Sequence, residues 1–305
     1  MSDSKRSLSR PAYDQTVLHQ NRVSYRRDQS PKPSRSGHVT VLMLAVFLLF
    51  AAYLGLSKHA AAQTAAQHQA QVLAEQKANN FHNQVNQLIA ANPQDNLSVV
   101  TYSSVDGLQT YGQTYAMDGA SDGKLLTAAA YLHQVEQGRA SLQTVHDGYS
   151  AAYWLKIMLV NSDDTAWSEL NNVYMSHDDL AAYAQGIGFG QYDPGVNTFT
   201  AADVARLLEK VYSGNLLSSA HRSLLLGYLA QANYRNYIVA AVPSGDQVYH
   251  KVGVNGDALN DAAIIKNGDK YVVLVIFTNG DGNYDLDHRG QLMRDITHQA
   301  TAAYL

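Results

Sequence analysis

The strongest pattern in the chain is an uninterrupted apolar run near its N-terminus. Val39 to Leu56 reads VTVLMLAVFLLFAAYLGL and carries no charge. At 1.5 Å per residue, a helix of this length measures about 27 Å, just enough to cross the hydrocarbon core of a bilayer. The pattern therefore predicts a transmembrane helix over residues 38–57.

A cleaved signal peptide is the alternative interpretation of this run, because three alanines, residues 60–62, offer a small-residue cleavage site. The 37 preceding residues and the length of the run are more typical of an uncleaved anchor. Only Lys58 follows the run closely, whereas five basic residues precede it: Arg22, Arg26, Arg27, Lys32 and Arg35. The positive-inside rule thus predicts a cytoplasmic N-terminus and an extracytoplasmic body in a single-pass membrane protein.

Polar sequence flanks the apolar run on both sides. Residues 1–37 are rich in Ser, Arg, Pro and Gln, which predicts a disordered basic cytoplasmic tail. Residues 58–74 carry Ala, Gln and His in helix-forming sequence, which predicts a helical stalk. The helix continues into a domain over 75–305 and ends at Asn92-Pro93.

Two hydrophobic periods alternate within residues 75–305. Apolar and polar residues alternate over 97–103 and 108–115, on either side of the turn signal Asp106-Gly107, which predicts a hairpin. From residue 123 to about 211, apolar residues recur every three or four positions, which predicts helices. Strands return as VYHKVGV, DAAIIKNG and KYVVLVIFTNG, and a last helix begins near Leu286. We expect an α/β (α+β) fold. Its antiparallel sheet of about five strands is flanked by N- and C-terminal helices and joined by an all-helical lobe.

Composition excludes several classes of function. Residues 1–37 hold eight basic and three acidic residues, for a net charge of +5, whereas the remainder holds fourteen and twenty-three, for −9. An acidic body repels phosphates, so no nucleic-acid partner is expected. The chain has no cysteine, which excludes disulfides, thiolate metal sites and a cysteine nucleophile.

Ser121-Asp122-Gly123-Lys124 lies where the predicted hairpin gives way to a helix. A serine at a helix N-terminus lies at the positive end of the dipole, and a lysine three residues later falls on the same face. Burial near another cation would lower the pKa of Lys124, so that its amine could accept the serine proton. The alternative is a helix-capping serine beside a solvated lysine. Ser2-Asp3-Ser4-Lys5 in the tail matches the same pattern.

Two later segments make the pattern more specific. Ser162-Asp163-Asp164 follows an apolar helix, and Lys251-Val252-Gly253 lies in an edge-like strand. A second such triplet, Lys266-Asn267-Gly268, is better explained as a hairpin turn. With S-x-x-K, S-D-[ND] and K-x-G in this order, residues 75–305 resemble the serine β-lactamases and penicillin-binding proteins (DD-peptidases), especially the class A β-lactamases.

The resemblance implies four catalytic residues. Ser121 would attack a carbonyl carbon and form an acyl-enzyme, and Lys124 would act as general base or guide the proton. Ser162 would relay a proton to the leaving nitrogen, and Lys251 would supply positive charge near the serine and the substrate carboxylate. The implied partners are a β-lactam or a peptidoglycan peptide, with no metal and no cofactor.

The resemblance also implies a substrate-binding strip. Asp164, Val252 and Gly253 would line it, and the backbone N–H groups of Ser121 and Val254 would form an oxyanion hole. Asp164 replaces the family's asparagine and brings a charge beside the catalytic lysine. Val252 replaces the usual threonine or serine, so a hydroxyl for the substrate carboxylate is missing.

The loop GIGFGQYDPGVNTFT departs from the family as well. Class A β-lactamases carry a glutamate there that activates the deacylating water. Here Asp193 is the only acid in the loop, so the deacylating base is Asp193 or is absent. We therefore expect a peptidase-like or slowly acylating enzyme acting on D-Ala-D-Ala-type peptides. An efficient class A-like β-lactamase and a catalytically degenerate relative that binds cell-wall peptide or a partner are the alternatives.

Other motifs have simpler explanations. His133, His146 and His177 do not share the spacing of a known metal motif and are expected on the surface. The segment 281–287 has oxygen ligands at alternate positions but lacks the glycine and glutamate of a calcium loop. We expect a strand-to-helix loop there, with Asp285 or Asp287 capping the last helix. The oligomeric state stays open.

Overall fold

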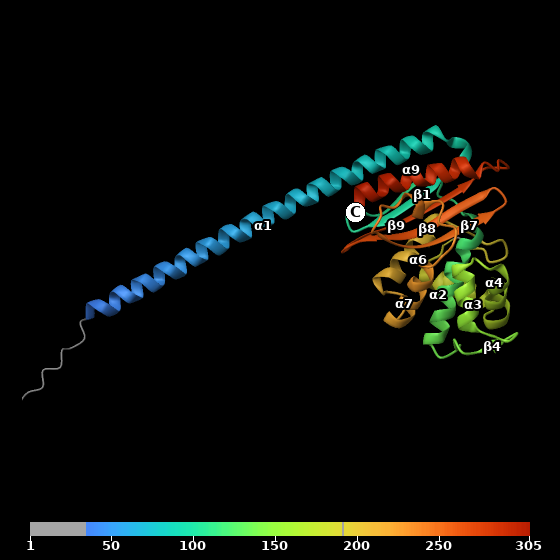
Figure 1. Ribbon diagram of the computed structural model, residues 1–305, viewed down its shortest axis with the longest axis horizontal. Coiled ribbons are helices and arrows are strands. Elements are labelled where there is room, and N and C mark those ends of the chain that lie inside the picture. The colour runs from blue at the N-terminus through green and yellow to red at the C-terminus, as the bar shows by residue number, and fades with distance from the viewer. Residues whose placement is uncertain (1–34, 191) are drawn as a thin grey trace, which may run out of the picture. The chain divides into compact units, whose positions relative to one another are not determined.

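The computed structural model describes residues 35–190 and 192–305, and the chain divides into two units, Met1–Ala62 and Gln63–Leu305 (Figure 1). The predicted tail lies outside the described residues up to position 34. Helix α1 runs from Arg35 to Ala91 without a break, so the predicted span, the stalk and the first domain helix belong to one helix. Its most apolar stretch is long enough to cross a membrane, and none of that stretch is buried.

The second unit is built on a five-stranded antiparallel sheet in the order β2-β1-β9-β8-β7. The strands are β1 (Ser98–Ser103), β2 (Gly107–Gly112), β7 (Gln247–Asn255), β8 (Ala258–Asn267) and β9 (Lys270–Asn279). Strand β1 pairs with β9, so the first and last strands of the sequence meet, as the sequence predicts. Strand β7 is one edge of the sheet and carries the third sequence motif.

The predicted second strand extends too far, because β2 ends at Gly112 rather than at Tyr115. Gly112 has a left-handed φ of 74°, and a Cβ built on it would lie 2.1 Å from the carbonyl oxygen of Leu97. The next residue, Gln113, donates its N–H to that same oxygen. Only glycine fits this close backbone approach, which turns the chain out of the sheet.

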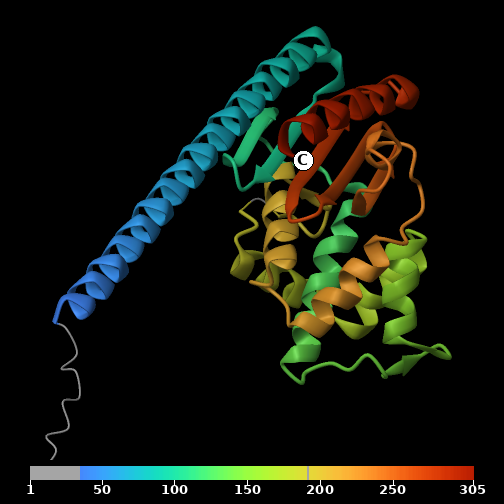
Figure 2. The same cartoon turned by 60° about the vertical axis from the view of Figure 1, so that its left-hand side comes forward.

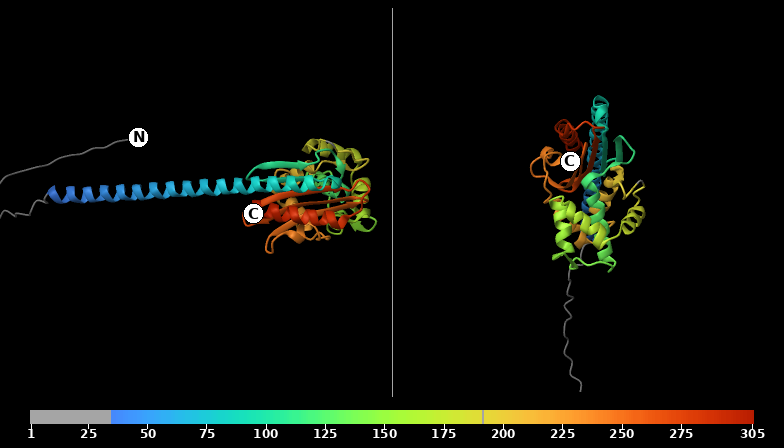
Figure 3. Two further views of the ribbon diagram at one scale, coloured as in Figure 1. Left: turned by 90° about the horizontal axis from the view of Figure 1, so that it is seen from above. Right: turned by 90° about the vertical axis from the view of Figure 1, so that its right-hand side faces the viewer.

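Helices cover both faces of the sheet, and each face has its own hydrophobic core. Helix α9 (Leu286–Tyr304) and the end of α1 pack on one face, as Figures 2 and 3 show. The short α8 (Ile238–Ala241) contributes Ile238 to the same core. Along β1, Val99 joins this core whereas its neighbour Val100 joins the other. Successive strand side chains point to opposite faces, so the nearly continuous apolar sequence of β9 serves both cores.

The opposite face carries the predicted helical lobe. It consists of η2 (Ala120–Asp122), α2 (Gly123–Glu136), α3 (Ala151–Val160), α4 (Asp164–Glu169), η3 (Leu170–Tyr174), α5 (His177–Ile187), α6 (Ala201–Ser213) and α7 (Ser219–Leu229). Two short ribbons were not predicted: β3 (Met117–Asp118) pairs with β6 (Thr198–Phe199), and β4 (Val145–His146) with β5 (Tyr149–Ser150). A 3-10 turn, η1 (Pro93–Asp95), follows α1, and Asp285 caps α9 by accepting the N–H of His288, as predicted.

Candidate active site

Ser121 lies on the 3-10 turn η2, between the ribbon strand β3 and helix α2. The preceding Ala120 has a φ of 44°, a left-handed conformation that is uncommon without glycine. The Asp118 carboxylate accepts the N–H of Ala120 at 2.8 Å and holds this turn. The N-cap position of α2 belongs to Asp122, so Ser121 is not the helix cap and its hydroxyl is free for other contacts.

Lys124 lies one turn after Ser121 and is completely buried. Its Nζ atom is 3.0 Å from Ser121 Oγ, 2.7 Å from the carbonyl oxygen of Ser162 and 2.6 Å from Asp164 Oδ1. The predicted alternative of a solvated lysine is therefore wrong. In its neutral form this amine can accept the hydroxyl proton of Ser121 directly, because no intervening group separates the two atoms.

The second motif forms the loop between α3 and α4. Ser162 has a left-handed φ of 59°, and Asp163 caps α4 by accepting the N–H of Ala166 at 2.8 Å. Asp164, the first residue of α4, reaches Lys124 although 87% of its side chain is exposed. The loop thus directs a hydroxyl and a carboxylate at the same buried amine.

Lys251 approaches from the edge strand β7 and is also buried. Its Nζ donates to Ser162 Oγ at 2.8 Å and to the carbonyl oxygen of Val252 at 2.5 Å. The Ser162 hydroxyl lies 3.3 Å from Lys124 Nζ as well. One hydroxyl therefore bridges the two lysines, an arrangement that could relay a proton.

Gly253 brings the edge strand against Ser121. A Cβ built on this glycine would lie 3.0 Å from the backbone nitrogen of Ser121 and 3.1 Å from the carbonyl oxygen of Gly119. Strand alternation places Val252 on the opposite face from Lys251, and its side chain is only 5% exposed. Val254, by contrast, is 47% exposed. The structure thus brings the backbone of this strand to Ser121 but turns the side chain of Val252 away from Lys251.

The pKa values of Lys124 and Lys251 are both lower than that of a free lysine. Burial lowers the pKa of Lys251 to about 8, while the carboxyl group of Asp122 opposes that shift. Burial also lowers the pKa of Lys124, and the carboxylate of Asp164 opposes it. Desolvation disfavours an ammonium ion in such a site, so each amine loses its proton more readily than a surface lysine does.

Asp122 is the acidic residue that sequence reasoning overlooked, although it lies inside the first motif. It is almost fully buried, and neither carboxyl oxygen has a hydrogen-bond partner among the described residues. Burial raises its pKa well above 3.8, with Lys251 opposing the shift and Asp261 adding to it. Burial thus favours the neutral carboxyl form of the residue directly after Ser121, and its only sequence signal is its place in the motif.

Replacing Asp122 with asparagine is expected to stabilise the fold at neutral pH. Because the pKa of Asp122 is raised in the folded state, the contribution of this residue to stability is most favourable below pH 3.8. That contribution declines at higher pH, as Asp122 ionises in the unfolded chain. The decline amounts to at most about 1.4 kcal/mol per pH unit, and asparagine abolishes it. Thermal unfolding of both proteins from pH 4 to 7 should show a higher Tm for the asparagine variant, with a difference that widens as the pH rises.

The surface substitution Asp269→Asn is the control for this measurement. Its plot of Tm against pH should run parallel to that of the wild type. A variant that is less stable than wild type at pH 7 would show instead that Asp122 is ionised and paired with Lys251.

Asn197 is a second residue that sequence reasoning missed. Its Nδ2 donates to the carbonyl oxygen of Ala120 at 2.8 Å, and its own carbonyl oxygen accepts the N–H of Gly119. Its buried Oδ1 has no partner among the described residues and lies 2.3 Å from a Cβ built on Gly123. Asn197 therefore ties its own loop to the turn that contains Ser121. Its left-handed φ of 55° suits asparagine, but that preference alone does not reveal the contacts with Gly119 and Ala120.

Asp193 has a different environment in the same loop. Its side chain is exposed, and Oδ1 accepts the N–H of Gly195 at 2.8 Å. Its backbone pairs with Thr198. A cavity of about 200 Å³ opens beside the site, and its lining includes Asp164, Trp167, Tyr192, Pro194 and Asn197. The acid at position 193 is thus held in a turn.

The chain resembles known proteins in sequence and in structure. The model of the "Beta-lactamase enzyme family" matches residues 144–304. No curated protein sequence matches the chain. Among solved structures, PBP-A has a TM-score of 0.68 at 21% identity and covers 73% of this chain and 95% of its own. A PBP-A mutant was solved as an acyl-enzyme complex with penicillin G, with a TM-score of 0.67 at 20% identity, covering 74% and 96%.

An ancestral class A β-lactamase has a TM-score of 0.67 at 23% identity, covering 73% of this chain and 99% of its own. A β-lactamase from Xanthomonas campestris pv. campestris has a TM-score of 0.64 at 20% identity, covering 72% and 96%. These likenesses establish the fold that the motifs predict, with its sheet, flanking helices and helical lobe.

Proposed function

The chain belongs to the Beta-lactamase enzyme family, and we propose that it is a serine hydrolase that forms an acyl-enzyme on Ser121. One observation carries the proposal: Ser121 Oγ lies 3.0 Å from the buried amine of Lys124. That distance allows direct proton transfer, and the lowered pKa of the amine favours its neutral form.

The proton path follows the contacts of Ser162. Ser121 Oγ attacks the substrate carbonyl carbon and loses its proton to Lys124 Nζ. The carbon–nitrogen bond then breaks, and Ser162 Oγ delivers a proton to the leaving nitrogen, replaced by one from Lys124. Lys251 donates to the same hydroxyl at 2.8 Å and keeps it oriented. Water completes the cycle by cleaving the ester.

The negative charge of the tetrahedral intermediate needs donors on the other side of the carbonyl. Close approach of β7 at Gly253 to the Ser121 nitrogen supports an oxyanion hole made by the N–H groups of Ser121 and Val254. One donor of this kind accounts for about 10²–10³ in rate in a well-studied protease.

A long-lived acyl-enzyme with a D-Ala-D-Ala-type peptide or a β-lactam fits these residues better than rapid β-lactam turnover. Asp193 is held by Gly195 in an exposed turn, and its side chain is one methylene shorter than glutamate. Val252 supplies no hydroxyl for a substrate carboxylate. The apolar stretch of α1 supports a membrane anchor. The basic residues before it support a hydrolase outside the cytoplasm, where cell-wall peptides would be its substrates.

Mass spectrometry of the full-length protein in detergent, after incubation with penicillin G, tests the proposal. We expect a persistent adduct on the peptide that contains Ser121. Rapid hydrolysis without an adduct would replace the proposal with an efficient β-lactamase. Neither adduct nor hydrolysis would overturn it in favour of a non-catalytic binding protein.

The substitution Asp164→Asn is expected to speed acylation near neutral pH. The Asp164 carboxylate raises the pKa of Lys124 against the effect of burial, so an amide there lets that pKa fall further. More of the amine is then neutral at pH 7, and the rise of the rate profile moves to lower pH. Because Asp164 is mostly exposed, we expect a change of only ~3-fold.

Asp163→Asn is the matched control, because asparagine also caps helices and Asp163 does not hydrogen-bond to Lys124. The pH profile of acylation should move less in Asp163→Asn than in Asp164→Asn. Stopped-flow acylation with a fluorescent penicillin measures both variants, and a profile that moves to higher pH in Asp164→Asn would contradict the role of the carboxylate.

A further inference from the structure

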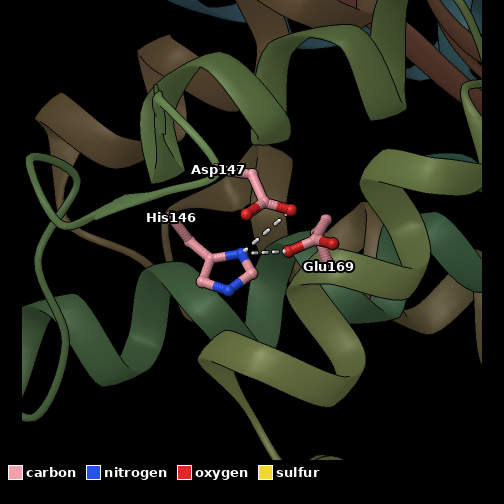
Figure 4. Close-up of side chains that lie close together, drawn as sticks. All are labelled: His146, Asp147 and Glu169. Carbon is pink, nitrogen blue, oxygen red and sulfur yellow. Dashed lines mark hydrogen bonds and ion pairs between the residues drawn. The ribbon is translucent and has the colours of Figure 1, made fainter.

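A second group of reactive side chains lies in the helical lobe, apart from the residues assigned to catalysis. His146 ends strand β4, Asp147 begins the following turn, and Glu169 is the last residue of α4. Figure 4 shows the three side chains converging, with the imidazole facing both carboxylates. His146 Nδ1 lies 2.8 Å from Glu169 Oε2 and 3.8 Å from Asp147 Oδ2.

The charges in this cluster are unbalanced. Within residues 35–190 and 192–305, His146 is the only ion-pair partner of either carboxylate. A neutral imidazole leaves two negative charges side by side, and a protonated one still leaves one. A divalent cation between the three groups would remove the repulsion between the carboxylates.

The donor set also matches a particular class of cation. Imidazole nitrogen suits zinc and its transition-metal neighbours, and carboxylate oxygens are ordinary zinc ligands. Zinc bonds of about 2.0–2.2 Å place tetrahedral ligand atoms roughly 3.3 Å apart. The three candidate atoms lie within 4.8 Å of one another. His146 must move slightly away from Glu169 and Asp147 slightly closer, which the exposed hairpin allows.

We propose that His146, Asp147 and Glu169 bind a divalent transition-metal cation of the zinc type. His146 Nδ1 and one oxygen from each carboxylate supply three ligands, and water takes the fourth position. The ion joins the β4–β5 hairpin to α4, whose first residue Asp164 contacts Lys124. Its role is to hold the helix that begins with the last residue of the second motif, which goes beyond the proposed hydrolase activity.

Two consequences separate a metal site from a plain ion pair. Bound metal stabilises the folded chain in proportion to its free concentration, whereas an ion pair is indifferent to it. Metal binding also weakens at low pH, because a protonated imidazole cannot coordinate.

Isothermal titration of ZnCl₂ into chelator-treated, full-length protein in detergent, together with thermal unfolding, tests the site. We expect one zinc ion per chain with a rise in Tm of several degrees. His146→Ala and Glu169→Gln should each lower the zinc affinity at least tenfold. Glu169→Gln keeps a hydrogen-bonding group at that position, so its metal-free Tm shows whether the variant still folds.

His133→Ala and His177→Ala are the matched controls, because each removes a histidine of the same lobe that lies outside the cluster. Both should keep the zinc stoichiometry and the rise in Tm. Absence of zinc binding to the wild-type protein, or binding that survives His146→Ala, would overturn the proposal. Adduct formation at Ser121 is measured separately, so failure of the zinc site and failure of the hydrolase remain distinguishable.

Discussion

Ser121→Ala is expected to abolish covalent labelling of the protein by penicillin G. Alanine lacks the Oγ atom that lies 3.0 Å from Lys124 Nζ, so no ester can form at this position. The neighbouring Ser162 hydroxyl cannot replace it, because it lies between Lys124 and Lys251 as an acceptor for both. Intact mass spectrometry should show unmodified protein after an incubation that labels the wild type fully.

Ser218→Ala is the control for this loss. Ser218 is the N-cap of α7, so its replacement also removes a serine at a helix start, but far from the motifs in sequence. This variant should label at the wild-type rate even though its unfolding free energy falls by about 1 kcal/mol with the lost cap. Adduct formation on the Ser121→Ala protein would identify a different nucleophile and remove the basis of the proposed mechanism.

Periodicity predicted the sheet and the lobe because the long strands lie between two cores and the helices of the lobe pack one face against one of them. Strand β9 is apolar at successive positions, and α6 repeats apolar residues at helical spacing. The two-residue strands of the β3–β6 ribbon are too short for any period to be visible. Their position depends on Asn197, whose contacts with Gly119 and Ala120 join segments about 77 residues apart.

The three motifs could be found in the sequence because each is a short local pattern in a fixed order, but their surroundings could not be predicted. That Asp122 is buried rather than solvated depends on β7 and β8, which lie far along the chain. The direction of the Val252 side chain depends on strand register: Val252 pairs with Asp261, which contacts His250 on the face away from Lys251. The acids around His146 gave no motif, because Glu169 arrives from a separate helix.

Lys124→Met is expected to lower the second-order rate constant of acylation by about 10²–10⁴-fold, the range that a positioned general base contributes. Methionine has a similar length and fits a buried site without a charge. Stopped-flow acylation should lose the rise with pH that the neutral amine produces in the wild type. The control is Lys210→Met. Lys210 lies on α6 and donates to the carbonyl oxygen of Ile187, so its replacement should leave the acylation rate unchanged.

Stability should respond to Lys124→Met in a different way from catalysis. The variant no longer buries an amine whose charged form is disfavoured by desolvation, and the Asp164 carboxylate left behind is 87% exposed and can be solvated by water. Lys251 still donates to Ser162 Oγ, so that hydroxyl keeps a partner. We therefore expect an unfolding free energy equal to or above that of the wild type, because apolar replacement of a buried charge is often neutral or stabilising. Loss of acylation with an unchanged Tm would assign Lys124 to proton transfer, whereas parallel loss of both would assign it to folding.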